Sequence, residues 1–500
     1  MKSFLSRRFA KPLIVGLSVL TLVLIVFGRS PALAVTPLHY TDLKFPPAPE
    51  IKVPDFTRFE LKNGMKVYLM EDHELPLVGG SVTVYTGDRL EPATQVGLAS
   101  IVGEVMRSGG TIQHPPDALN ETLEQRAASV EAGIGTDSGS AGFSALSEDL
   151  DEVFGLFAEV LRQPAFPQEK IDFSKNQTKG GIARRNDDPS GIAGREFQKL
   201  IYGADSPYAR TVEYATLDNI ARNDIVNFYK KYYHPNNMLL GIVGDFEPTK
   251  MRSLIEAKLG DWQPDPNAAA FQNRATLPAV AQAKKGGVFF VDQPQLTQSN
   301  VLIGHLGGKL SDPDYAALSV LNEVMNGFGG RLMNEVRSRQ GLAYSIYAYW
   351  SARFDYPGIF IGGGQTRSDA TVPFIKSTLA ELQRVRTTPI TAQELTRAKD
   401  SVINSFIFSF ATPGQTLSRV MRYDYYDYPE DFIFQYQKQV EATTTAQIQK
   451  AAQTHLKPEN IVTLVVGNTK EINPSLTTLS PNAQVTTIDV TIPGLEINPK

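Results

Sequence analysis

The chain has 500 residues, of which 42% are hydrophobic, and it carries 49 lysines and arginines against 53 aspartates and glutamates. This length supports more than one ordinary domain with a sizeable core, and the balanced charge lacks the polybasic pattern of a nucleic-acid-binding protein. The chain contains no cysteine. A thiol nucleophile, a cysteine-ligated zinc and an iron–sulfur cluster are therefore excluded.

Residues 1–34 have the pattern of an export signal peptide. Basic residues near the start precede an apolar run at 13–27, and Ala32-x-Ala34 then forms a small-residue cleavage pattern. The run is shorter than the roughly 20 residues of a membrane-spanning helix. We therefore expect an exported protein of the periplasm or another extracytoplasmic compartment. If the segment stays uncleaved, residues 13–27 would instead anchor the chain to the membrane.

The first half begins with strand signals and continues with helical ones. Residues 35–54 are rich in proline and predict an extended lead-in. Two β-like runs then flank Asn63-Gly64, a strong signal for a hairpin, and residues 78–88 continue as a strand. Helical patterns dominate over 98–233, and the apolar run at 238–246 is typical of a buried strand.

A stretch without hydrophobic periodicity divides the chain. Residues 263–285 contain several prolines and alanines and predict a linker. The linker separates an N-terminal domain, 55–262, from a C-terminal domain, 286–475. Residues 476–500 are left as a C-terminal tail.

The two halves resemble each other in sequence. Residues 99–106 align with 318–325 at an offset of 219, and residues 234–246 align with 456–468 at an offset of 223. Two matches in the same order at nearly one offset predict a duplication. Each half has strands, then helices, then a final strand-like run. This order predicts an α+β fold of two homologous halves, each a mostly antiparallel sheet with helices packed on one face.

Residues 96–111 predict a helix with one buried face. The apolar side chains recur at helical spacing, at Leu98, Ile101, Val102, Val105 and Met106. The opposite face carries Ser100, Gly103, Glu104 and Arg107, an unusual set because glycine weakens a helix. The chain has no HExxH or HxxEH pair, nucleophile elbow, phosphate-binding loop or dinucleotide fingerprint.

The order of these features resembles the M16 family of metallopeptidases, which includes pitrilysin and the mitochondrial processing peptidase. The similarity covers most of 55–470 and is strongest in GGRLMNEVRSRQGLAYSIYAYW (329–350), with a shorter match in SPYAR (206–210). The resemblance implies two homologous halves with an M16/LuxS-like metallohydrolase fold. In active members a G-x-A-H-x-x-E-H helix supplies two zinc-ligand histidines and a general-base glutamate. A later helix supplies a glutamate as the third ligand.

The resemblance places other residues at these zinc positions. Ser100 stands at the first histidine, Gly103 at the base, Glu104 at the second histidine and Gly181 at the third ligand. One carboxylate and one hydroxyl do not replace two imidazoles and a carboxylate, and Gly103 offers no base to deprotonate water. The resemblance therefore implies a degenerate site, with no metal and no catalytic residue on this chain alone.

The second half matches a different functional pair of the family. In family members an arginine and a tyrosine seven residues apart hold the substrate backbone, and the tyrosine helps to stabilise the oxyanion. Arg337 and Tyr344 have this spacing, and both side chains can donate hydrogen bonds to a carbonyl oxygen that gains charge. From residue chemistry alone, Arg337 is a solvated helix residue and Tyr344 packs at a strand start. The resemblance instead implies retained contact with substrate.

Three further features predict structural roles. His305 is expected at a strand end and His114 in a loop. The aromatic and acidic stretch RYDYYDYPEDF (422–432) predicts packing at a helix end or at an interaction edge.

Together these features predict a non-catalytic, substrate-binding subunit of a heterodimeric M16-type zinc peptidase, inactive alone. An HxxEH-bearing partner chain would supply zinc and base, and an extended peptide would add as a strand to a sheet edge. One alternative is an inactive scaffold or peptide-binding protein of the same fold. A third option, a hydrolase with Ser100 as nucleophile, has no histidine near Ser100 in sequence to activate it. No nucleic-acid partner is expected, and membrane contact is expected only through an uncleaved 13–27.

Overall fold

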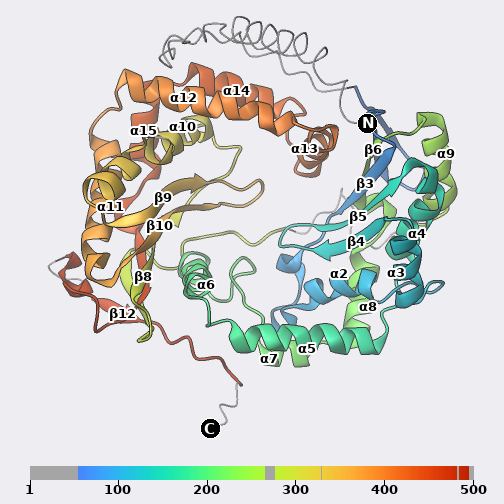
Figure 1. Ribbon diagram of the computed structural model, residues 1–500, viewed down its shortest axis with the longest axis horizontal. Helices are drawn as coiled ribbons and strands as arrows, with labels where there is room; N and C mark the ends of the chain where they lie inside the picture. The colour runs from blue at the N-terminus through green and yellow to red at the C-terminus, as the bar shows by residue number, and fades with distance from the viewer. Residues whose placement is uncertain (1–54, 265–275, 328, 481–483, 495–500) are drawn as a thin grey trace, which may run out of the picture. The chain divides into compact units, whose positions relative to one another are not determined.

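The first half builds a six-stranded sheet in the order β1-β2-β6-β3-β5-β4 (Figure 1). Neighbouring strands are antiparallel except β2 and β6, which run parallel. The strands are β1 (Thr57–Glu60), β2 (Lys66–Glu71), β3 (Leu77–Val84), β4 (Ser129–Ile134), β5 (Gly139–Leu146) and β6 (Met238–Gly244).

The computed structural model describes residues 55–264, 276–327, 329–480 and 484–494, which all belong to one compact unit, Val53–Lys500. The expected signal peptide, its apolar run and the proline-rich lead-in lie outside the described residues. Within the described ranges, no helix combines the length and the apolar character needed to cross a bilayer.

The predicted hairpin at Asn63-Gly64 is confirmed. It joins β1 to β2, and Gly64 has φ +87°, in the left-handed region that glycine adopts without strain. The buried Asn63 side chain donates hydrogen bonds to the carbonyl oxygens of Leu259 and Trp262, at 2.8 and 3.1 Å. The turn is thereby tied to the end of the first half.

The helical interpretation of residues 98–233 is wrong at β4 and β5. These strands are rich in glycine, alanine and serine instead of the β-branched residues that signal strands. Burial nevertheless alternates along β5, where Ala141, Phe143 and Ala145 are buried. The Phe143 ring lies over a glycine of the neighbouring strand, because a Cβ on Gly80 of β3 would lie 2.4 Å from that ring.

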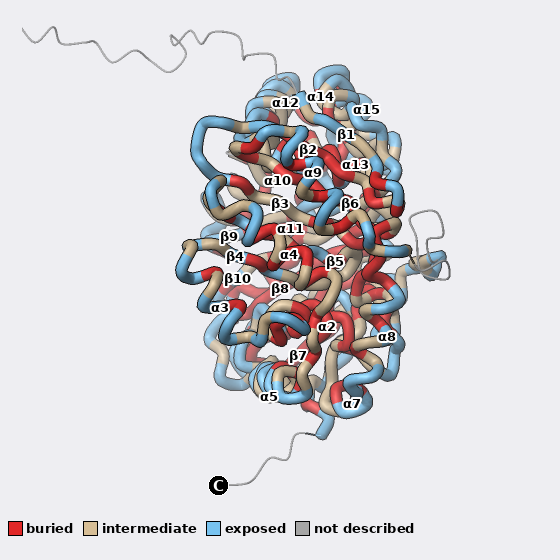
Figure 2. Tube along the Cα trace, turned by 90° about the vertical axis from the view of Figure 1, so that its right-hand side faces the viewer, coloured by how far each residue is buried: buried red, intermediate tan, exposed pale blue. Residues whose placement is uncertain are grey.

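The helices of the first half pack mainly on one face of its sheet, where their apolar side chains and the inward side chains of the strands form one core. Figure 2 shows this burial on the inner sides of the elements, while α5 is largely exposed. The helices are α2 (Leu98–Ser108), α3 (Pro116–Gln125), α4 (Leu150–Arg162), α5 (Gln168–Arg184), α6 (Pro189–Tyr202), α7 (Tyr214–Asp218), α8 (Arg222–Tyr232) and α9 (Pro248–Leu259).

The second half repeats this architecture with a sheet in the order β12-β7-β11-β8-β10-β9. Its strands are β7 (Gly287–Asp292), β8 (Gln298–Leu306), β9 (Ala343–Ser351), β10 (Ile359–Arg367), β11 (Val462–Gly467) and β12 (Val485–Thr487). Its helices are α10 (Tyr315–Asn326), a π-helix (Met333–Arg339), α11 (Thr371–Thr387), α12 (Ala392–Phe406), α13 (Pro413–Tyr425), α14 (Phe432–Ala442) and α15 (Thr445–His455).

The predicted duplication is confirmed by equivalent elements. The first pair of aligned segments forms α2 and α10, and the second pair forms β6 and β11. Both of these strands lie third from one sheet edge and pair parallel with the first long strand of their half. The fold class predicted from the order of strands and helices is therefore correct.

Each half lends one helix to the other half. Helix α6 of the first half packs on the second sheet, against Phe289, Val291 and Leu464. Helix α13 of the second half packs on the first sheet, against Tyr68 and Leu239. Both helices begin with a proline that follows a side-chain cap, Asp188 before α6 and Thr412 before α13. The two exchanged helices therefore start in the same way.

The described part of the segment predicted as a C-terminal tail, 476–480 and 484–494, contacts both halves of the fold. It contains β12, which pairs parallel with β7. Beyond the strand, the Val490 carbonyl accepts a 2.6 Å hydrogen bond from the Asn186 side chain, and Ile492 is buried in the core of the first half.

Candidate functional site

Helix α2 carries three of the four degenerate zinc positions and is anchored firmly at its start. Its predicted apolar face is confirmed: Leu98, Ile101, Val102, Val105 and Met106 are all buried. The buried Glu91 carboxylate accepts hydrogen bonds from the backbone N–H groups of Gly97 and Ala99, at 3.0 and 2.9 Å. Burial raises the pKa of Glu91 to about 7, although these two N–H groups oppose the rise.

Gly103 of α2 is buried where this helix packs against β4. A Cβ at this position would lie 2.5 Å from the backbone nitrogen of Ile134 and 2.7 Å from the carbonyl carbon of Gly133. Arg107, one turn later, donates a 2.6 Å hydrogen bond to the Val130 carbonyl and so also joins the helix to β4. The helix lies so close to the strand that no side chain fits at Gly103 without backbone movement.

The other degenerate positions differ in their surroundings. Ser100 is exposed on α2, and Glu104 accepts a 2.5 Å hydrogen bond from the Ser174 hydroxyl of α5. Gly181 lies on α5, and a Cβ there would meet nothing within 4 Å. The structure therefore joins α2 and α5 through Glu104 and Ser174.

These residues do not fit zinc. A structural or catalytic zinc needs three or four nitrogen, sulfur or carboxylate ligands, and only Glu104 of the four positions offers one. In the described part of the chain, no group of three histidines, aspartates or glutamates is placed to hold a metal ion. The described histidines bond elsewhere: His73 with Asp245, His114 with Glu159, His234 with the Lys230 carbonyl, His305 with the Leu306 carbonyl and His455 with Asp314.

His305 and Asp424, within the stretch 422–432, make structural contacts. His305 lies buried on β8, with Nδ1 2.8 Å from the Leu306 carbonyl and Nε2 accepting from the Lys457 N–H. Burial lowers its pKa, which favours the neutral ring. The stretch contains the end of α13, whose Asp424 pairs with Lys66 of β2 at 2.9 Å.

Arg337 and Tyr344 lie on either side of the turn that leads into β9. Arg337 is in the last turn of the π-helix, and Tyr344 is the second residue of β9. Gly341 in the turn has φ +63°, which reverses the chain at low cost. π-Helical turns are frequent at functional sites.

A β-bulge sets the direction of Tyr344. On β10, Gln365 pairs with Ser345 and Thr366 pairs with Ala343, so Tyr344 is the extra residue without a partner in the ladder. A bulge bends the strand and re-aims the side chain at that point. The Tyr344 side chain is 82% exposed, more than the other large hydrophobic residues of the described chain.

The structure brings the two predicted residues into direct contact. The guanidinium carbon of Arg337 lies 4.6 Å from the centroid of the Tyr344 ring, a cation–π geometry. One guanidinium nitrogen also lies 3.8 Å from the Met333 sulfur. No carboxylate of the described residues pairs with Arg337, whereas Arg339 is paired with Glu335. Apart from the weak contact with the Met333 sulfur, the Arg337 N–H groups and the Tyr344 hydroxyl can donate to another molecule.

The pair lies beside an open sheet edge. Strand β9 is the last strand of the second sheet, as β4 is of the first, and no described strand pairs with the outer side of either. Along β9, Ile346, Ala348 and Trp350 point into the helix-covered core. The intervening tyrosines, Tyr347 and Tyr349, lie on the opposite face.

Two features of the site escape sequence reasoning. The bulge at Tyr344 depends on the register between β9 and β10, which no local pattern in AYSIYAYW reveals. The closeness of α2 and β4 is signalled by the glycine at position 103, but only tertiary packing shows that β4 is the neighbour.

Comparison with known families places the chain in context. Residues 66–202 match the profile described as insulinase (peptidase family M16), and residues 219–402 match the profile described as peptidase M16 inactive domain. These matches together span more than half of the sequence. The chain belongs to the M16 family.

Curated M16 relatives carry different descriptions. An uncharacterized zinc protease of Streptomyces coelicolor is 27% identical over 55% of this chain and 60% of its own length. The uncharacterized zinc protease YmxG of Bacillus subtilis is 23% identical over 72% of this chain and 86% of its own. The non-peptidase homolog YmxG of Helicobacter pylori is 24% identical over 80% of this chain and 91% of its own.

Solved structures share the M16 fold. A peptidase M16 inactive domain from Pseudomonas fluorescens superposes with a TM-score of 0.73 at 25% identity, covering 83% of this chain and 98% of that one. A protease structure from Helicobacter pylori gives a TM-score of 0.71 at 18% identity, covering 83% and 99%. The chain therefore has the M16 fold of two homologous halves.

Proposed function

We propose that this chain is the non-catalytic, substrate-binding subunit of a heterodimeric M16-type peptidase. An HxxEH-bearing partner supplies the zinc and the general base, and both chains work in an extracytoplasmic compartment. The observation that carries the proposal is the contact between Arg337 and the exposed Tyr344 beside an open sheet edge, where no carboxylate of the described residues pairs with the guanidinium.

The pair is suited to hold a peptide backbone. A guanidinium donates through a planar fork and a phenol through one hydroxyl, so together they can bind a carbonyl oxygen and stabilise it as it gains charge. The stacking limits the freedom of both side chains before substrate arrives, which reduces the entropy lost on binding. An extended peptide adds as a strand to a sheet edge, and on this chain the open edge next to the pair is β9.

The degenerate face of α2 supports the division of labour between two chains. Gly103 leaves no room for a base, and Glu104 is bonded to Ser174. In this proposal the partner therefore supplies the zinc and the general base, while this chain binds and orients the substrate.

Reconstitution tests the proposal. The purified chain should hold no stoichiometric zinc by elemental analysis and should cleave no peptide by itself. Cleavage should appear when an HxxEH-bearing M16 chain from the same organism is added, and the two should elute together in size-exclusion chromatography. A catalytic chain that is fully active alone and gains nothing from this one would contradict the proposal.

A scaffold without a role in proteolysis is the second candidate function. The description of the Helicobacter pylori relative as a non-peptidase homolog favours it. Under this alternative, the chain would form a stable assembly whose peptidase activity, if any, does not change when Arg337 and Tyr344 are replaced.

A further inference from the structure

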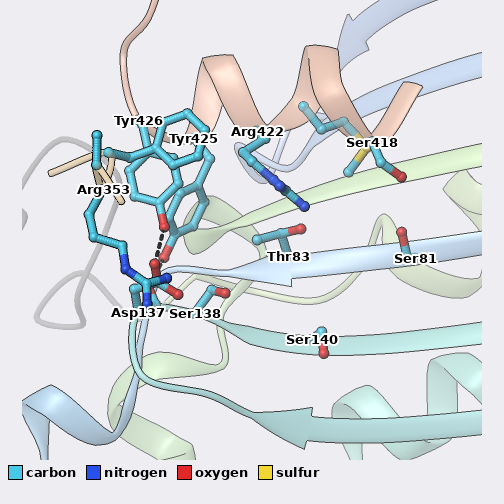
Figure 3. A pocket seen from close by; sticks show the side chains of 13 residues that line it. Ser81, Thr83, Asp137, Ser138, Ser140, Arg353, Ser418, Arg422, Tyr425 and Tyr426 are labelled. Atoms are coloured by element: carbon cyan, nitrogen blue, oxygen red, sulfur yellow. Dashed lines mark hydrogen bonds between the residues drawn. The ribbon is translucent and has the colours of Figure 1, made fainter. Parts of the chain in front are cut away.

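A polar cavity of about 450 Å³ lies away from Arg337 and Tyr344, between the first sheet and elements of the second half. Its floor is the face of β3 and β5 that their own helices leave open, and its wall is α13. The loop after β9 and the turn between β4 and β5 complete it (Figure 3). The cavity is therefore built by the same exchange that brings α13 onto the first sheet.

Two arginines give the cavity a positive charge. Arg353 follows β9 and Arg422 lies on α13, and both side chains line the cavity (Figure 3). Their backbones are fixed, because the Arg353 carbonyl accepts from the Leu310 N–H and the Arg422 carbonyl accepts from the Tyr426 N–H. Across the described ranges, neither guanidinium has an ion-pair or hydrogen-bond partner.

The one carboxylate in the cavity wall is held by tyrosines. Asp137 accepts a 2.5 Å hydrogen bond from the Tyr426 hydroxyl on its side chain, and its backbone carbonyl accepts a 2.6 Å bond from Tyr425. Tyr426 is fixed in turn by stacking on Phe354, with ring centroids 4.5 Å apart and planes 5° from parallel. Asp137 is thus directed to the tyrosines, and the cavity keeps two cationic groups against one anionic group.

Hydroxyl groups line the rest of the surface. Ser81 and Thr83 of β3 and Ser140 of β5 point to the open face, because the alternate residues of these strands are buried in the helix-covered core. Ser138 and Ser418 add two more. In the described structure none of these five hydroxyls is hydrogen-bonded to protein, so all five are available as donors.

We propose that this cavity binds an anionic ligand through a carboxylate or phosphate group. The planar fork of a guanidinium matches two oxygens of such an anion, and the surrounding hydroxyls can donate to the remaining oxygens. The volume admits more than a single inorganic ion, so the anionic group is carried on a small polar molecule or on an acidic peptide side chain. This site is distinct from the proposed peptide-holding pair and does not depend on the proposed function.

Isothermal titration calorimetry on the full chain tests the site with three probes: pyrophosphate, citrate, and a short peptide rich in glutamate. We expect binding of at least one probe, weakened by salt because the attraction is ionic. The double variant Arg353→Gln/Arg422→Gln should weaken that binding by about tenfold or more. Binding of pyrophosphate or citrate identifies a small-molecule ligand, and binding of the peptide alone identifies an acidic protein segment.

Matched controls keep the result interpretable. Arg184→Gln removes an exposed arginine of α5 outside the cavity and should leave binding unchanged. A glutamine-rich peptide of the same length should not bind. The inference is overturned if none of the three anions binds, or if the double variant, with an unchanged thermal unfolding midpoint, binds as tightly as the unmodified protein.

Discussion

The Arg337 guanidinium stacks on the Tyr344 ring at 4.6 Å, across a turn that joins a π-helix to an edge strand. The bulge at Tyr344 and the left-handed Gly341 create this contact between residues seven positions apart. The contact lies on the surface, so its value to the fold and its value to a bound peptide can be separated by experiment.

Removing the stacked pair should cost little stability. An exposed cation–π contact contributes about 0.5–1 kcal/mol, and Tyr344 is 82% exposed. Arg337→Ala and Tyr344→Ala should therefore each lower the free energy of unfolding by less than about 1 kcal/mol in urea denaturation. A loss of several kcal/mol would show that the pair is a structural element and not a free binding surface.

Gly103 should not tolerate even a methyl group. Alanine is intrinsically better than glycine in a helix by about 1 kcal/mol, but the added Cβ would meet the β4 backbone at 2.5–2.8 Å. We expect Gly103→Ala to lower the free energy of unfolding by about 1–3 kcal/mol, as overpacking does. Gly181→Ala is the matched control, because nothing lies within 4 Å of its Cβ position, and it should be neutral or stabilising.

The Gly103 result has a clear counter-outcome. If Gly103→Ala were as stable as Gly181→Ala, then α2 would have room to move away from β4, and a base could be restored at that position. If the contact between α2 and β4 is rigid, the changes in the free energy of unfolding caused by the two substitutions must differ in sign or by more than about 1 kcal/mol.

Acid should weaken the fold through the Arg331–Glu394 pair. The buried Arg331 donates two hydrogen bonds to Glu394, at 2.7 and 3.0 Å, and this interaction lowers the pKa of Glu394 to about 2 against the opposing effect of burial. Because the pKa is lower in the folded state, the stabilisation is complete above the ordinary value of 4.5. It is lost as the pH falls from about 5 to about 2, and at most about 3 kcal/mol is involved.

Urea unfolding at pH 7 and at pH 3 measures this effect. Glu394→Gln should be clearly less stable than the unmodified protein at pH 7, and the difference should shrink at pH 3. Glu256→Gln breaks the half-exposed Arg252–Glu256 pair and serves as the control, with an expected change below about 0.5 kcal/mol. A Glu394→Gln deficit that stays constant with pH would rule out the titration of Glu394 as its cause.

The sequence predicts those parts of the fold whose signals are local. The α2 face follows from helical periodicity, the β1–β2 hairpin from Asn63-Gly64, and the duplication from two aligned segments. Strands β4 and β5 are missed, because their glycine, alanine and serine residues do not show strand propensity.

Long-range packing determines the remaining features. Helices α6 and α13 each pack on the sheet of the other half, and no sequence pattern within either helix indicates which sheet it covers. The Arg337 and Tyr344 spacing marks the pair, but the stacking depends on the bulge between β9 and β10. The close contact of Gly103 with the β4 backbone likewise appears only in the folded chain.

The most direct test of whether Arg337 and Tyr344 hold substrate is peptide cleavage by the complex of this chain with its catalytic partner chain. The substitutions are made only in this chain. Arg337→Ala and Tyr344→Phe should each lower kcat/KM by about tenfold or more, because each removes a donor to the substrate carbonyl. Arg339→Ala and Tyr349→Phe, in the same segment but outside the stacked pair, should stay within about twofold. Full activity of the Arg337→Ala/Tyr344→Phe double variant would contradict the proposed role of this chain in holding substrate.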